Sequence, residues 1–176
     1  MTRLVRKLAT LTLLGAAACS SDDLSKAIDY GCPRVVVLAD ASTVTVFTPG
    51  APESPENVMF TAHIANTSAE CNTTKNLVIA NVAMAIKVNA GPAPLPGPMQ
   101  LPFFLAATEY DTRVTGKVVR NLDVVIPPGV PTVEAVPHFD GIQIPIAEGN
   151  TSRNYEIVVG FQLTPDQVRY NRTPRP

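Results

Sequence analysis

The sequence has no tryptophan, only two histidines and three cysteines, and few aromatic residues, which make up 6% of its 176 positions. Neither His63 nor His138 stands in a spacing typical of zinc ligands. His138 and Asp140 could form a base and its orienting acid, but no serine lies in a nucleophile elbow and no glycine-rich phosphate loop occurs. The sequence therefore indicates no catalytic centre, and we expect no cofactor or bound metal.

Charge of either sign is sparse, with 14 basic and 15 acidic residues. Three of the basic residues, Arg3, Arg6 and Lys7, lie within the first eighteen positions, which contain no acid. Without that segment the formal net charge is −4. Nucleic acids require a basic face on a protein that binds them, so we expect no nucleic-acid partner.

The N-terminus has the pattern of an export signal. Its three basic residues precede a short apolar run, Leu8 to Leu14, and small residues lead to Cys19. The run is too short to span a bilayer as a helix. The site resembles the lipobox of bacterial lipoproteins, with Ala16 in place of the usual leucine. We predict a signal peptide over residues 1–18 and lipid on Cys19, although the alanines also suit ordinary signal peptidase and simple secretion.

Acylation of Cys19 would leave Cys32 and Cys71 as the remaining thiols. Export places both in an oxidising compartment, where a disulfide persists. We expect this disulfide, with free thiols as the alternative, to link the segment before the first strand to a loop after Ile64. Residues 19–31 form a lipidated tether in this scheme, and residues 32–176 form one folded domain.

Most of residues 32–176 shows apolar residues at every second position, which is typical of half-buried strands. Proline and glycine clusters separate these segments. The pattern predicts an all-β protein, a single antiparallel β-sandwich of immunoglobulin-like architecture. Glu109 and Asp111 flank Tyr110 at an expected hairpin, which we interpret as a solvated turn in preference to a calcium site. The alternating segments are 43–46, 58–64, 82–88, 122–126, 142–146 and 155–163.

A helix is expected only at the C-terminal end. Thr164, Pro165 and Gln167 supply an N-cap, a proline at the first helical position and the third residue of a capping box. The segment 160–172 either closes the fold or presents a partner surface. Its candidate solvent-facing residues are Gln162, Arg169 and Tyr170.

Several segments resemble a family of uncharacterised alphaproteobacterial lipoproteins. The segments that carry the resemblance are 32–35, 38–42, 101–106, 144–146, 160–167 and 170–172. Since the family has no assigned activity, the resemblance implies a lipoprotein with one domain and transfers no catalytic residue.

These features favour a membrane-anchored periplasmic lipoprotein that acts as a non-enzymatic interaction or envelope-assembly module. Its expected contacts are the membrane, through the lipid on Cys19, and an envelope protein. Ser20 stands where aspartate would favour retention in the inner membrane, so we expect the outer membrane, with the domain facing the periplasm. The alternative is an envelope hydrolase or small-ligand carrier whose site is built from loops.

Overall fold

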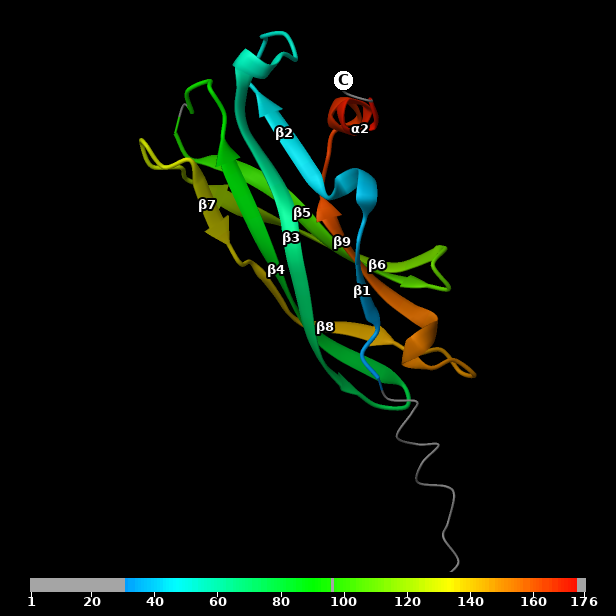
Figure 1. Ribbon diagram of the computed structural model, residues 1–176. Coiled ribbons are helices and arrows are strands. Elements are labelled where there is room, and N and C mark those ends of the chain that lie inside the picture. Colours follow the sequence, from blue (N-terminus) through cyan, green and yellow to red (C-terminus); the bar gives the residue numbers. More distant parts are fainter. Residues whose placement is uncertain (1–30, 96, 174–176) are drawn as a thin grey trace, which may run out of the picture.

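The computed structural model describes residues 31–95 and 97–173, which form two packed β-sheets (Figure 1). The first sheet has the strand order β1-β9-β5-β6, and the second has the order β2-β3-β4-β7, with β8 also paired to β4. The all-β sandwich expected from the alternating pattern is confirmed. The strands of the first sheet are β1 (Arg34–Val37), β5 (Met99–Glu109), β6 (Arg113–Val124) and β9 (Tyr155–Phe161). Those of the second are β2 (Thr43–Phe47), β3 (Val58–Thr73), β4 (Leu77–Ala90), β7 (Thr132–Ala135) and β8 (His138–Pro145).

The core lies between the two sheets. In β4, every second residue from Val78 to Val88 is buried, because successive side chains of a strand point to opposite faces. Burial of these apolar side chains supplies most of the driving force for folding. The largest side chains that are almost fully buried are Phe60, Phe103, Phe139 and Phe161. Phe103 and Phe139 come from different sheets and pack edge to face, with ring centroids 5.2 Å apart.

One strand pair departs from the antiparallel arrangement. β1 runs parallel to β9, with Val35 opposite Ile157 and Val37 opposite Val159. After β1 the chain passes through a 3-10 turn, η1 (Ala39–Ala41), and enters β2 in the other sheet. Because the chain leaves the first sheet at this point, its edge strand β1 has only four residues. The other strand pairs of the described chain are antiparallel, so this pair is an exception within the expected antiparallel sandwich.

Cys32 and Cys71 form a disulfide, with their Cα atoms 5.4 Å apart. Cys32 precedes β1 as expected, whereas Cys71 lies inside β3 and not in a loop after Ile64. A bulge between Ile64 and Asn66 interrupts the register, and β3 then continues beside β4 as far as Thr73. The disulfide therefore connects the start of the first sheet to a strand of the second.

The C-terminal helix α2 (Pro165–Arg172) begins with the predicted capping box. The backbone N–H of Gln167 donates to Oγ1 of Thr164 at 3.3 Å, and the backbone N–H of Thr164 donates to Oε1 of Gln167 at 2.9 Å. Two further 3-10 turns, η2 (Pro55–Asn57) and η3 (Ser152–Asn154), precede β3 and β9. Among the residues that the structure describes, no helix has the length and apolar character needed to cross a membrane.

Candidate functional site

The structure separates the three residues predicted to form a partner surface. Gln162 is exposed just after β9, and its Oε1 accepts a hydrogen bond from Nζ of Lys117 on β6 at 2.7 Å. The same ammonium lies 4.4 Å from the centre of the Phe104 ring. Gln162 therefore lies on the outer face of the first sheet next to β5, and its side chain meets Lys117 of β6.

Arg169 is exposed on α2, where Nη1 donates to Oδ1 of Asp166 at 2.5 Å. The hydrogen bond to Asp166, and its charge, raise the pKa of Arg169 above the ordinary arginine value. Tyr170 is half-buried, and its ring packs edge to face on Phe47 with 5.0 Å between centroids. The prediction that Tyr170 faces solvent was wrong, because α2 turns this side chain towards β2.

The neighbouring residues of α2 also attach the helix to the fold. Nδ2 of Asn171 donates to the backbone oxygens of Asp40 and Thr43 at 2.9 and 2.7 Å. Arg172 forms an ion pair with the carboxylate of Asp40. These contacts support the interpretation that much of the segment 160–172 closes the fold, and they leave Gln162 and Arg169 as the exposed members of the predicted surface.

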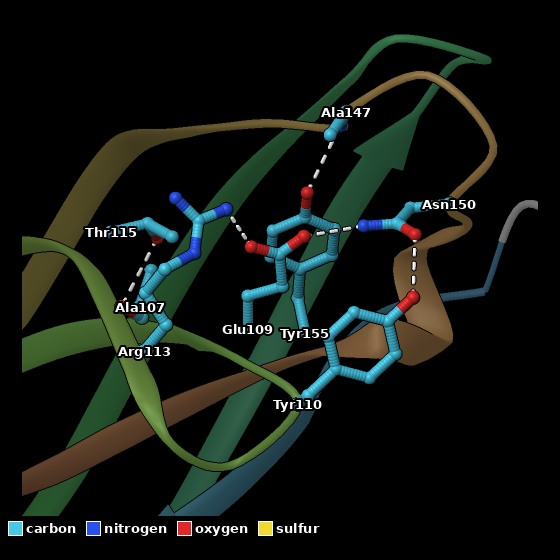
Figure 2. A network of polar contacts seen from close by, with 8 residues as sticks. All are labelled: Ala107, Glu109, Tyr110, Arg113, Thr115, Ala147, Asn150 and Tyr155. Carbon is cyan, nitrogen blue, oxygen red and sulfur yellow. Dashed lines mark hydrogen bonds and ion pairs between the residues drawn. The ribbon is translucent and has the colours of Figure 1, made fainter.

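A polar network lies at the other end of the sandwich, near the tip of the β5–β6 hairpin (Figure 2). At its centre, Glu109 is buried, with 5% of its surface exposed. Its carboxylate accepts hydrogen bonds from Arg113 and from the side-chain amide of Asn150. The hydroxyl of Tyr110 donates to Oδ1 of Asn150 at 2.6 Å. The interpretation of Glu109 as part of a solvated turn was therefore wrong.

The hairpin tip itself has an uncommon backbone. Tyr110 and Asp111 both have positive φ angles, 50° and 59°, in the left-handed region that glycine and asparagine usually occupy. The backbone N–H of Tyr110 donates to the carbonyl of Asn154 at 2.8 Å, which fixes the turn against η3. The network thus holds the exposed Tyr110 ring in a defined position at the hairpin tip.

The two histidines do not meet a catalytic partner within the described part of the chain. His63 is half-buried in β3, while His138 and Asp140 are exposed near the start of β8. No hydrogen bond between the side chains of His138 and Asp140 is formed in residues 31–95 and 97–173. The same residues contain no group of three or more histidine, cysteine, aspartate and glutamate side chains that could hold a metal ion.

A feature that sequence reasoning missed is the exposure of β6. All nine residues from Arg113 to Asn121 are exposed, including Val114 at 61% and Val119 at 48%. β6 forms the margin of the first sheet and pairs only with β5. Its sequence lacks the strict alternation that identified other strands, but the run of valine and threonine between basic residues is a strand signal in itself.

Comparison with known proteins gives no family assignment. No family model, no curated protein and no solved structure matches the chain. Cys19, Ser20 and most of the predicted tether lie outside the described residues.

Proposed function

We propose that this protein is an exported lipoprotein, anchored to the outer membrane through Cys19, whose β-sandwich binds another protein of the cell envelope. The sequence supports anchoring, through the basic N-terminal segment, the short apolar run and the cysteine that follows the small residues. The two or three acyl chains of a bacterial lipoprotein would anchor it stably, whereas one chain binds a membrane only marginally.

The observation that carries this proposal is the separation of the two ends of the sandwich. The described chain begins beside Cys32 at one end, together with the β3–β4 connection, and α2 lies at the opposite end (Figure 1). A tether that leads into Cys32 would therefore present α2 on the side away from the membrane. Arg169 is exposed there, where a partner in the periplasm could contact it.

Anchoring is tested by Cys19→Ala in cells, with Ser20→Ala as the matched control. We expect Cys19→Ala to abolish the mass of attached acyl chains and to give either an uncleaved precursor or soluble protein. Ser20→Ala retains the cysteine and should stay lipidated. Membrane retention of Cys19→Ala, together with no acyl mass on the wild type, would contradict the proposal.

The binding function is tested by placing a photo-crosslinking amino acid at position 162 or 169 in the native envelope. Lys87, which is exposed on the outer face of the second sheet, is the control position. We expect a defined protein adduct from position 162 or 169 and none from position 87. Equal adducts at all three positions, or adducts at none, would contradict a partner surface that includes these residues.

A further inference from the structure

The edge strand of the first sheet, β6, has one edge that is not paired with another strand of the described chain. β6 hydrogen-bonds to β5 along one side, and no strand in the described part of the chain pairs with the other. A strand of this length with free backbone donors and acceptors can accept one more strand, and extended peptides bind many proteins in this way.

A cleft lies between β5 and β6 of the first sheet and β8 of the second, and we call it the β6–β8 cleft. It has a volume of about 200 Å³, and its apolar lining comes from Leu105, Ala107, Val118 and Ile142. Gly116 on β6 and Gly141 on β8 also border it, and no atom lies within 4 Å of the position that a Cβ would take at either glycine. The cleft therefore has room for the apolar side chains of an added strand.

Farther along β6 from the hairpin tip than the cleft residues Gly116 and Val118, Arg120 contacts β8. Its Nη1 donates to the backbone oxygen of His138 at 2.8 Å, and its guanidinium carbon lies 5.0 Å from the centre of the Phe139 ring. This contact joins β6 to β8 at Arg120. Gly116 and Gly141 border the cleft at positions nearer the hairpin tip. The apolar side chains of a strand added to β6 could therefore enter between β6 and β8 only on the hairpin side of Arg120.

The charge of β6 indicates what kind of strand would bind. Arg113, Lys117 and Arg120 are exposed, and no acidic residue occurs between Arg113 and Leu122. Lys117 lies on the outer face, whereas Arg113 and Arg120 lie on the inner face, where Arg113 pairs with Glu109 and Arg120 donates to the backbone oxygen of His138. If β6 paired with β6 of a second copy, six cationic side chains would share one ladder, which is unfavourable because like charges repel across paired strands. An acidic strand would instead be attracted to this margin.

We propose that β6 binds an extended segment of a partner protein in which apolar and acidic residues alternate. The apolar residues would enter the β6–β8 cleft, and the acidic residues would lie beside Lys117 on the outer face of the sheet, because successive side chains of a strand face opposite sides. This inference rests on the proposed function of an interaction module and gives its partner a chemical character.

The test measures binding of synthetic peptides to the full-length protein. The first peptide alternates valine and glutamate, the second has lysine in place of glutamate, and the third contains the residues of the first in scrambled order. We expect the first peptide to bind at least about tenfold more tightly than the other two, and to slow amide hydrogen exchange in β6 selectively.

The matched variants are Gly116→Val, which fills the cleft, and Ser68→Val, which adds the same side chain to an exposed position of β3. Gly116→Val should weaken binding about tenfold, while Ser68→Val should leave it unchanged. Equal binding of all three peptides, or protection outside β6, would overturn the inference. Self-association that protects β6 without peptide would also overturn it, in favour of a second copy.

The two experiments distinguish a failure of the β6 inference from a failure of the proposed interaction function. If Gly116→Val weakens peptide binding as expected but leaves the envelope adducts at position 162 or 169 unchanged, those adducts come from a different surface and β6 is not the partner site. If the wild-type protein binds no peptide while those adducts form, the interaction function stands and the β6 inference fails.

Discussion

Strands β2 and β6 both lie at the margins of sheets, yet only β2 is covered. The helix α2 packs on β2 through Tyr170 and Phe47, and Asn171 donates a hydrogen bond to the backbone oxygen of Thr43. β6 has no such cover among the described elements, and ten of its twelve residues are exposed. A sheet margin offers unpaired backbone groups, which proteins usually cover or protect with charge.

The two edge strands differ in how their unpaired backbone groups are protected. β2 is short, with five residues, and a side chain of α2 takes the place of a neighbouring strand. β6 has twelve residues, a bulge opposite Ala107 and Thr108, and three basic side chains. We expect the bulge and the basic residues to disfavour pairing of β6 with β6 of a second copy, while the proposed acidic partner would still be attracted to it.

The largest expected effect on stability comes from removing the Cys32–Cys71 disulfide, which links the sheet that contains β6 to the sheet that contains β2. Cys32→Ser with Cys71→Ser should reduce the free energy of unfolding by roughly 4 kcal/mol, because the disulfide closes a loop with a sequence separation of 39. Denaturant unfolding of the oxidised wild type and the double variant measures this change. A loss below about 1 kcal/mol would mean that burial alone holds the sheets together.

A smaller loss of stability is expected from a substitution at Gly160, where η1 packs against the first sheet just before β2. A Cβ at Gly160 would lie 2.9 Å from Cβ of Ala41 and 3.0 Å from the Phe104 ring. Gly160→Val should therefore cost about 2 kcal/mol through overpacking. Gly116→Val is the control, since its Cβ meets no atom within 4 Å. Thermal unfolding compares the two, and equal melting temperatures would refute the close contact.

The cover of β2 itself is tested by Asn171→Ala. Loss of the two side-chain hydrogen bonds should cost about 1 kcal/mol and speed amide exchange in β2, with little change in β6. Arg169→Ala, on the exposed side of the same helix, should change stability by less than about 0.5 kcal/mol. If both variants behave alike, α2 does not protect β2 through Asn171.

The smallest effect is expected on β6. Val119→Thr, at a side chain that is 48% exposed, should alter the free energy of unfolding by less than about 0.5 kcal/mol. A peptide bound on β6 should dissociate from this variant at the wild-type rate, since Val119 lies on the outer face of the sheet and does not line the β6–β8 cleft. Surface plasmon resonance measures that rate. A large loss of stability would show that Val119 is part of the scaffold.

The sequence was most informative where one face of a strand meets the core and the other meets solvent. β4 follows this rule, and local capping chemistry fixed the start of α2. β5 does not follow it, since Phe104 and Ala106 are buried on the outer face against Ala41, so both faces are apolar. Alternation cannot identify a strand that is buried on both sides.

The candidate sites were less predictable because they depend on contacts between distant segments. The bulge after Ile64 shifts the parity of β3, so the polar residues that follow it read as a loop although they belong to the strand. The burial of Glu109 depends on Asn150, and that of Tyr170 on Phe47. Local residue preferences contain no information about such pairs.

The disulfide also determines how the molecule would bear mechanical load. Tension applied to the chain ahead of Cys32 divides between the backbone that leads into β1 and the covalent bond to Cys71. β1 shares four residue pairs with β9, whereas β3 shares thirteen with β4. The covalent route delivers the pull to the longer ladder, so we expect an oxidised protein to resist unfolding under such tension and a reduced one to yield first at β1.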